Sequence, residues 1–380
     1  MIAPRFTRKL FRFELWQHWF QAHPLQATIL GVIGFIAVTI AAAVYADALV
    51  VNYSFTLGQP AGIGAHVTVT QTLNQYDARH YIDIAEDGYH AVDNAAFLPL
   101  YPLLVHMVAI ATGLSVEWAA LLVSWVALLG AGVVLMYWLR LEIKLHQIRN
   151  ISPWLILGII AIFPTAFYFA LAYTESLFVL LTVGSLWLYR RGNYAGAGVL
   201  AALSAVTRYQ GVVLAVFFLA DYVFAARKDW RKLIPFVCAG AGLLAYMAYL
   251  AMHYGSPFEF LLAEKQWQRL SGNVVLNLIR SFTPVYAWFV AVFGVGLWGV
   301  WRYLGKAYFV YSLVFILLPL SSGRFDSINR YMLSLAPLFL GLAIVGTKVA
   351  PKPMRLIYIV SSAFLLGWSI MLFANGYWVA

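Results

Sequence analysis

Long runs of apolar residues, separated by short polar segments, dominate the chain from residue 27 to residue 374. A helix that crosses a membrane needs about 20 largely apolar residues. The runs predict spans near 27–49, 97–113, 116–139, 153–172, 174–189, 195–224, 233–254, 284–302, 306–322, 330–347 and 354–374. Several runs are too short or too long for one clean crossing, so we expect about 9–12 spans. Polar residues interrupt the 195–224 run at 207–210, which favours two half-helices there.

Composition assigns the class of protein. The chain is 63% hydrophobic and 11% charged, whereas soluble domains carry roughly 25% charged residues. We therefore predict an all-α polytopic membrane protein, organised as one integral-membrane domain over residues 1–380. Its polar parts are a cytoplasmic or interfacial lead-in at 1–26 and two loops at 50–96 and 255–283. The first apolar run is too long for a signal peptide, so we read it as a retained span.

The net charge of +10 bears mainly on topology. Scattered basic residues favour cytoplasmic loops and contact with anionic lipid, and they do not form the single patch typical of nucleic-acid binding. Basic clusters at 140–149, 190–191, 227–232, 302–306 and 348–355 cannot all be cytoplasmic if there are eleven full crossings. The half-helices, and a re-entrant 97–113, would reduce this conflict. The first loop, 50–96, follows one span and is expected outside the cytoplasm.

The stretch NQYDARHYIDIAEDGYH, residues 74–90, is unusually polar for this chain. Asn74 is a candidate helix cap, Asp77 fits the first turn, and Gly88 fits a helix end. One face of the predicted helix is apolar and the other is charged, at spacings of three and four. The apolar face holds Ala78, Tyr81, Ile82 and Ala85, and the polar face Asp77, His80, Asp83 and Asp87. We expect a short amphipathic helix at the membrane surface.

Two interpretations of this helix stay open. Its charges could be no more than a solvated face, with Asp77 as a helix-start charge. Alternatively Asp77 is a general base that takes a proton from an acceptor hydroxyl. Pro99 and Pro102 start the next span at once, which would hold the helix at the mouth of the bundle.

Ionisable residues inside apolar runs are costly in a membrane and are therefore functional candidates. Glu175, Arg208 and Arg330 are of this kind. The arginines could grip a phosphate, since a guanidinium matches phosphate oxygens. The structural alternative is an internal salt bridge, for example between Glu175 and Arg208. The loop 255–272 is amphipathic. Four apolar residues could enter lipid, namely Phe258, Phe260, Leu261 and Trp267, and Lys265 and Arg269 could meet an anionic headgroup; the alternative is a simple interfacial anchor.

Four segments, in order, resemble one known family. They are QYDARHYIDIAEDGY with AFLPLYPLL, AYTESLFVLL with VTRYQGVVL, YGSPFEFLLAEKQWQR, and SINRYMLSLAPLF, spread over about residues 70–340. These resemble the blocks of the second mannosyltransferase of GPI-anchor assembly and its bacterial relatives. Departures from the family pattern are Tyr76 for Trp, Leu98 for Phe, Gln210 for Ser and Glu264 for Gln.

The resemblance implies an inverting GT-C type integral-membrane glycosyltransferase, with an extracytoplasmic active site and a polyprenyl-phosphate sugar, commonly mannose, as donor. Asp77 matches the family's first-loop carboxylate, and Arg208, Arg269 and Arg330 match basic positions for the donor phosphate. The resemblance also suggests residues that bind or orient substrate, namely Arg79, His80, Glu86, Glu175, Gln210, Trp267 and Tyr331. The acceptor would be a lipid-linked molecule or a glycan, and the short loops favour a bacterial plasma membrane.

No cofactor is expected, because a lipid phosphate is already a good leaving group. A divalent metal on Asp77, His80, Asp83 and Asp87 stays open as an alternative. Two other functions also stay open: a transporter or flippase of lipid-linked sugars, and an inactive relative that serves as a complex subunit. Against the transporter, the chain shows no inverted repeat.

Overall fold

The computed structural model describes residues 22–49, 51–54, 59–63, 68–267, 273–325 and 327–379. The longer helices are α2 (Pro24–Leu49), α5 (Leu100–Thr112), α6 (Val116–Leu145), α8 (Glu175–Arg190), α9 (Tyr194–Ala205), α10 (Leu214–Phe224), α11 (Ile234–Tyr254), α14 (Pro284–Tyr303), α15 (Lys306–Leu320), α17 (Ala336–Lys348) and α18 (Lys352–Ala374). The shorter ones are α3 (Val69–Leu73), α4 (Asp77–Asp87), α7 (Pro153–Ala161), α12 (Glu259–Ala263), α13 (Val274–Ser281) and α16 (Ile328–Leu333).

Single 3₁₀ turns and one small hairpin complete the secondary structure. The turns are η1 (Val92–Ala96), η2 (Ala166–Ala170), η3 (Tyr209–Val213), η4 (Trp230–Leu233) and η5 (Glu264–Trp267). Strands β1 (Val51–Ser54) and β2 (Gln59–Ile63) pair antiparallel in the first loop. The described chain is therefore almost entirely helical, as the apolar runs predict.

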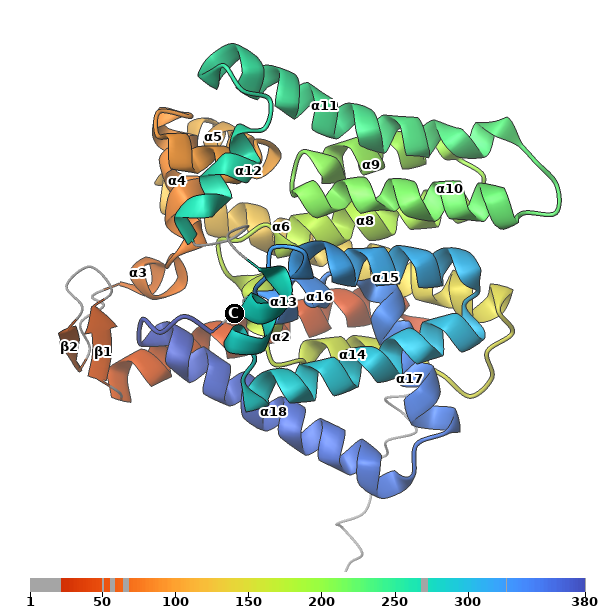
Figure 1. Ribbon diagram of the computed structural model, residues 1–380. Helices are drawn as coiled ribbons and strands as arrows, with labels where there is room; N and C mark the ends of the chain where they lie inside the picture. The colour runs from red at the N-terminus through yellow and green to blue at the C-terminus, as the bar shows by residue number, and fades with distance from the viewer. Residues whose placement is uncertain are drawn as a thin grey trace, which may run out of the picture.

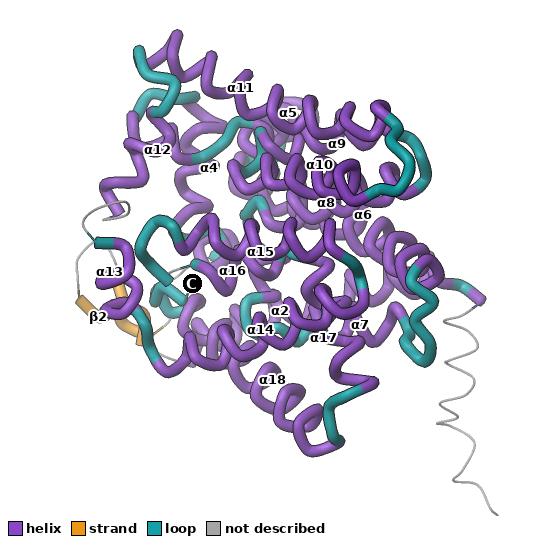
Figure 2. Tube along the Cα trace, turned by 45° about the vertical axis from the view of Figure 1, so that its right-hand side comes forward, coloured by secondary structure: helices purple, strands orange, loops and turns teal. Residues whose placement is uncertain are grey.

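The helices form two neighbouring groups (Figure 1). In one group α6 packs on α8, α8 on α9, and α9 on α11. In the other α14 packs on α17, and α2 packs on α18. Contacts of α6 with α2 and of α10 with α15 join the groups. Figure 2 shows the same bundle from a second direction, with α4, α12 and α13 on one side and the loops of the basic clusters on the other.

The length of the helices decides how many can cross a membrane alone. Five helical segments are long and apolar enough: Pro24–Ala48, Val116–Leu145, Trp230–Tyr254, Pro284–Tyr303 and Lys352–Ala374. Five more apolar segments are 10–17 residues long: Leu100–Thr112, Tyr194–Ala205, Tyr209–Phe224, Lys306–Leu320 and Ala336–Lys348. The expected 9–12 spans are therefore reached only if the short segments are counted. The protein is an integral membrane protein whose bundle mixes long and short helices.

Several predicted spans are broken helices. The 195–224 run divides into α9, η3 and α10, as expected from its polar interruption. The 153–172 run was predicted to be one span and is not: α7 ends at Ala161 and the chain continues as the buried turn η2. The 330–347 run divides into α16 and α17. Hydropathy alone did not reveal the breaks in the 153–172 and 330–347 runs, because an irregular segment buried in protein is as apolar as a helix.

The basic clusters meet at one end of the bundle. Arg190 lies 3.0 Å from Glu142 and 3.4 Å from Asp221, and Asp221 lies 2.9 Å from Lys232. The remaining two clusters lie at the same end, as two cation–ring contacts show. Lys306 Nζ lies 5.4 Å from the ring centroid of Phe224, and Lys348 Nζ lies 4.9 Å from that of Tyr303. The broken and short helices thus allow all five clusters to share one end. The first-loop helices α3 and α4 lie at the opposite end (Figure 1).

The first-loop helix matches its predicted register. Helix α4 begins at Asp77, and Gly88 caps its end with a φ of 81°. All four residues of the predicted apolar face are buried, at 8% exposure or less. The face packs on α5 and α6, so the helix is fixed to the bundle rather than held by its own propensity.

The predicted cap of this helix is wrong. Asn74 ends the preceding helix α3, and its side-chain amide donates to the carbonyl of Glu117 at 3.4 Å. The N-cap of α4 is Tyr76, which makes no side-chain capping bond. Asn74 instead belongs to a separate short helix upstream, α3, which Thr68 starts with a capping box.

The second loop is only partly available to lipid. Phe260 of α12 is 6% exposed and packs against Tyr246 and Leu250 of α11. Its predicted role in lipid anchoring is therefore wrong. Phe258 and Leu261 are exposed.

Glycines set the close crossing of α14 and α17. A Cβ on Gly341 would overlap the carbonyl oxygen of Gly296, and one on Gly299 would overlap the carbonyl oxygen of Gly341. Small residues at such crossings let two helix backbones touch, which is a main source of helix association in membranes. In the same helix α17, a Cβ on Gly346 would meet no atom within 4 Å.

We expect Gly341→Ala to destabilise the protein by about 1–3 kcal/mol, because the added methyl forces two backbones apart. Gly346→Ala is the matched control and should leave stability unchanged or slightly raised. Thermal unfolding of both variants in detergent checks this. Equal melting temperatures would mean that the crossing is looser than described.

Candidate active site

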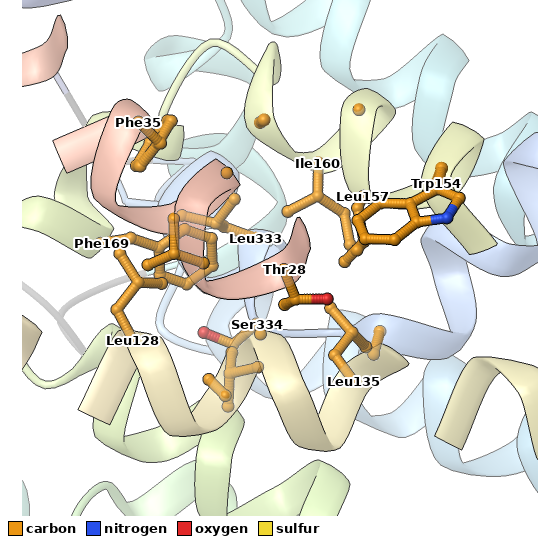
Figure 3. A pocket seen from close by; sticks show the side chains of 18 of the residues that line it. Thr28, Phe35, Leu128, Leu135, Trp154, Leu157, Ile160, Phe169, Leu333 and Ser334 are labelled. Carbon is orange, nitrogen blue, oxygen red and sulfur yellow. The ribbon is translucent and has the colours of Figure 1, made fainter. Parts of the chain in front are cut away.

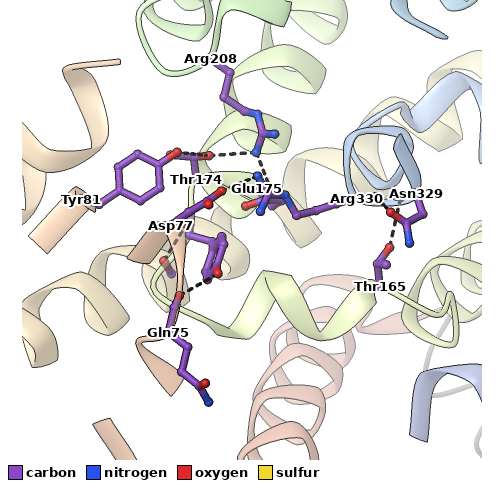
Figure 4. Close-up of polar contacts among 11 residues, drawn as sticks. Gln75, Asp77, Tyr81, Thr165, Thr174, Glu175, Arg208, Asn329 and Arg330 are labelled. Atoms are coloured by element: carbon purple, nitrogen blue, oxygen red, sulfur yellow. Dashed lines mark hydrogen bonds and ion pairs between the residues drawn. The ribbon is translucent and has the colours of Figure 1, made fainter. Parts of the chain in front are cut away.

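Four charged side chains from distant segments meet between the two helix groups (Figure 4). Arg330 Nη2 lies 2.7 Å from Asp77 Oδ2, and Arg330 Nε lies 3.0 Å from Glu175 Oε1. Arg208 Nη1 lies 2.6 Å from the same Glu175 oxygen. The result is a continuous chain of ion pairs, Asp77–Arg330–Glu175–Arg208, in which two carboxylates balance two guanidinium groups.

Helix starts and helix breaks position all four groups. Asp77 and Glu175 are the first residues of α4 and α8, where the helix dipole favours a negative charge. Arg208 stands at the break between α9 and η3, and Arg330 lies in the short helix α16. Irregular backbone at membrane depth is tolerated where it is buried in protein or lines a cavity, and transporter sites use such breaks to place polar groups.

The backbone before Asp77 is strained. Tyr76 has φ 56° and ψ −120°, a region that non-glycine residues rarely adopt. Strain of this kind costs of order 1–3 kcal/mol and persists where the surroundings enforce it. Here the ring of Tyr76 packs against two other rings, with centroid distances of 5.8 Å to Phe373 and 5.0 Å to Trp378. The strained turn aims the Asp77 carboxylate at Arg330.

Asp77 is the accessible end of the ion-pair chain. Its side chain is 23% exposed, while those of Arg330 and Glu175 are 5% and 0% exposed. Among the described residues, Oδ1 of Asp77 has no hydrogen-bond partner, so this oxygen can accept a proton. Burial raises the pKa of the nearby phenols of Tyr76 and Tyr81 above their usual range. Both phenols therefore stay protonated.

Glu175 forms the salt bridge that the sequence offered as a structural alternative. It holds Arg208 and Arg330 with one oxygen, and Arg208 also donates to the hydroxyl of Thr174 at 3.0 Å. Tyr81 contacts the same hydroxyl at 3.4 Å. The pairing orients both arginines, whether or not they also bind a ligand.

Aromatic rings enclose Arg330. Its Cζ lies 5.3–5.6 Å from the ring centroids of Tyr168, Tyr173, Tyr331 and Trp378. Such contacts stabilise a desolvated guanidinium. Within the described part of the chain, Nη1 of Arg330 is buried and has no hydrogen-bond partner. This unused donor is free to bind an anionic oxygen.

The remaining predicted residues of the first loop lie apart from the ion pairs. Arg79 and Glu86 are exposed. His80 Nδ1 contacts the Asn94 side-chain oxygen at 3.0 Å, and its ring stacks on Phe97 at 4.4 Å. His80 thus braces the loop around η1, and no described contact joins it to Asp77.

The later predicted residues differ in what the structure shows. Tyr331 lies under Arg208, with 5.0 Å from Cζ to the ring centroid. Gln210 is 2% exposed, and its amide nitrogen has no described partner. Arg269 and the side chain of Trp267 lie outside the described residues, so the phosphate role of Arg269 stays a prediction.

The proposed metal cluster does not assemble in the described residues. Among the described residues, which include Asp77, His80, Asp83 and Asp87, no three His, Cys, Asp or Glu side chains lie close enough together to hold a metal ion.

Sequence reasoning missed part of the site. Thr174 precedes Glu175 directly, so its place beside Arg208 could have been suspected. Tyr168, Tyr173 and Trp378 carry no local signal, since aromatic residues are common in this chain. Only the fold brings them to Arg330.

An apolar cavity of about 350 Å³ adjoins α16 (Figure 3). Its walls come from α2, α6 and α7, with Phe35, Leu128 and Leu157 among them. Leu333 and Ser334, which follow Arg330 in the chain, line it as well. The cavity and the ion-pair chain therefore share one element.

Fold and site together define a class: a polytopic helical membrane protein with a buried charge network, open to water at one carboxylate. The family model described as mannosyltransferase (PIG-V) matches residues 27–245. This chain belongs to that family, which confirms the resemblance found in the sequence.

Curated relatives agree with the family. The chain is 30% identical over 207 residues to GPI alpha-1,6-mannosyltransferase 2 of Mus musculus, covering 50% of this chain and 41% of that protein. It is 31% identical over 157 residues to the Rattus norvegicus protein of the same name, covering 39% and 31%. The chain thus spans less than half the length of the curated relatives it matches.

Among solved structures, the oligosaccharyltransferase of Archaeoglobus fulgidus, with a tethered acceptor peptide, is similar at a TM-score of 0.46 and 10% identity. The match covers 94% of this chain and 55% of that one.

We predict that Glu175→Gln destabilises the protein by about 3–5 kcal/mol, since it leaves two buried arginines sharing one carboxylate. Asp83→Asn on the exposed face of α4 is the control and should change stability by less than about 0.5 kcal/mol. Denaturation of both variants in detergent gives the comparison. If Glu175→Gln were as stable as Asp83→Asn, the arginines would not depend on this carboxylate.

Proposed function

We propose that this protein is an inverting glycosyltransferase that moves a sugar, mannose, from a polyprenyl-phosphate donor to a lipid-linked or glycan acceptor. The observation that carries the proposal is the pairing of Asp77 with Arg330 at 2.7 Å, with an open oxygen on the first and an unused donor on the second. Membership in the mannosyltransferase (PIG-V) family supplies the reaction class.

The two groups suit the two ends of a sugar transfer. Asp77 takes the proton of the acceptor hydroxyl, whose oxygen attacks the anomeric carbon. The bond from that carbon to the phosphate oxygen breaks, and its electron pair leaves with the phosphate. Arg330 binds the departing phosphate through Nη1, with Arg208 behind it, and stabilises the charge that develops there. Attack opposite the leaving phosphate inverts the anomeric carbon.

The apolar cavity supports a lipid donor. A polyprenyl chain is a run of branched apolar units, and each buried methylene stabilises binding by about 0.8 kcal/mol. A chain whose phosphate lies at Arg330 could reach the cavity past Leu333, which lies one helical turn further along α16 and lines the cavity.

The charge distribution supports an orientation. All five basic clusters lie at the end of the bundle away from α3 and α4, and basic loops favour the cytoplasm. The Asp77 end would then face outward, on the side where the sequence places the first loop. We propose that the protein resides in a bacterial plasma membrane.

The proposal predicts that Asp77→Asn lowers sugar transfer about 10²–10⁴-fold, the usual contribution of a general base. Membranes that hold equal amounts of wild type, Asp77→Asn or Asp83→Asn are supplied with radiolabelled polyprenyl-phosphate mannose and a host lipid extract. Asp83→Asn, on the exposed face of the same helix, should transfer normally.

Two results would oppose the proposal. Equal activity of Asp77→Asn and wild type would reduce Asp77 to a helix-start charge. Absence of transfer by wild type would favour the flippase or the inactive subunit, which a lipid-flipping assay then separates.

A second prediction concerns the donor's chain. Gly31 lines the cavity and has room for a side chain, so Gly31→Leu should fill part of the cavity. We expect KM for a long polyprenyl-phosphate mannose to rise about tenfold, as two lost methylene contacts would cause. KM for a short two-isoprene analogue should not change.

Gly34→Leu is the matched control, because Gly34 lies one turn along α2, has equal room and does not line the cavity. If Gly31→Leu raised KM for both donors, or for neither, the cavity would not hold the chain.

A further inference from the structure

The segment that follows α18 folds back over the site. Helix α18 ends at Ala374, and Gly376, with φ 78°, lets the chain reverse. Asn375 donates to the carbonyl of Ala46 in α2 at 3.3 Å. At the other end, Asn329 donates to the carbonyl of Val379 at 3.4 Å. The segment Asn375–Val379 is thus tied to α2 on one side and to α16 on the other.

These ties place Trp378 against Tyr76 and Arg330. Its ring meets the Tyr76 ring edge-on, with centroids 5.0 Å apart and an interplanar angle of 72°. Arg330 Cζ lies 5.6 Å from the Trp378 ring centroid. Tyr76 directly precedes Asp77, and Arg330 is the ion-pair partner of Asp77. Trp378 therefore lies against the guanidinium that pairs with Asp77 and against the residue that precedes Asp77.

Trp378 keeps a substantial exposed surface. Trp378 is 40% exposed, although Tyr76 and Arg330 cover part of it. Burial of an indole is strongly favourable, so an open one next to a buried charge network is available to a ligand. The match to the family model ends at residue 245 of this chain, so it assigns no role to Trp378.

We propose that Trp378 is a specificity-determining residue whose open indole face stacks on the pyranose ring being transferred. This inference rests on the proposed function. A pyranose has hydroxyl edges and faces of C–H bonds, and an aromatic face carries the negative charge that C–H groups prefer. The transferred sugar is joined to the phosphate held at Arg330 Nη1 and faces the acceptor hydroxyl at Asp77 Oδ1, so it lies beside this ion pair. Trp378 contacts the Arg330 side of the pair and the Tyr76 ring next to it.

The proposal differs from a purely structural role. If Trp378 only covered Arg330, its loss would weaken every ligand that uses the arginine. If it stacks on the sugar, its loss weakens the sugar-bearing lipid alone. A comparison of polyprenyl-phosphate mannose with polyprenyl phosphate that lacks the sugar separates the two roles, and it needs no turnover.

The experiment measures equilibrium binding of both lipids to the full-length protein in detergent. We expect Trp378→Ala to weaken binding of polyprenyl-phosphate mannose roughly tenfold, about 1.4 kcal/mol, and to leave polyprenyl phosphate unchanged. Trp378→Phe, which keeps an aromatic face, should recover most of the loss. Trp368→Ala is the matched control, since Trp368 is an exposed tryptophan of α18 whose ring contact is with Phe364.

Each outcome decides between the roles. Equal weakening of both lipids, or a Trp378→Phe variant as weak as Trp378→Ala, would overturn the inference. In transfer assays the same loss should appear in KM for the donor, with kcat changed little. If wild type transferred no sugar yet bound the mannose lipid in a Trp378-dependent way, the proposed function would fail and this inference would stand. If wild type bound neither lipid, both would fail.

Discussion

The carboxylate of Glu175 is the constraint on which the arrangement of the site depends. It is fully buried, and one of its oxygens holds both Arg208 and Arg330. An isolated charge in such a place costs several kcal/mol, so the three groups can be buried only together. This requirement fixes the start of α8, the break before η3 and the short helix α16 relative to one another. Arg330 then carries the constraint to Asp77 and α4.

Irregular backbone gathers where these charges meet. Tyr173 donates from its hydroxyl to the carbonyl of Gln75 at 2.8 Å, and Thr165 donates to the carbonyl of Asn329 at 3.2 Å. These bonds tie the turn between α3 and α4 to the segment before α8, and α16 to the segment after α7. Because each break is supported by a neighbour, the site is held rigidly, which suits a group that must meet its substrate in one orientation.

Burial falls along the ion-pair chain from Glu175 through Arg330 to Asp77. The closed end supplies fixed charge in a dry place, where it acts strongly. The open end can reach a water-borne or lipid-borne hydroxyl. The apolar cavity is lined by Leu333 at the end of α16, the helix that also carries Arg330.

The sequence by itself determined the helical membrane class, the register of α4 and the break within 195–224. These features are written in local patterns: apolar length, the spacing of Ala78, Tyr81 and Ile82, and the polar interruption at 207–210. Family motifs marked Asp77, and the pairing of Glu175 with Arg208 was already foreseen as an alternative.

Only the tertiary structure decided the breaks after α7 and before α17, and the place of Trp378. It also joined Asp77 to Arg330, which lie 253 residues apart in the chain. The physical reason is that a local pattern shows which side of an element is apolar, but not which neighbour covers it. In a chain this apolar, buried irregular segments and helices carry the same hydropathy. Their difference lies in hydrogen bonds and ion pairs that exist only after the helices have packed.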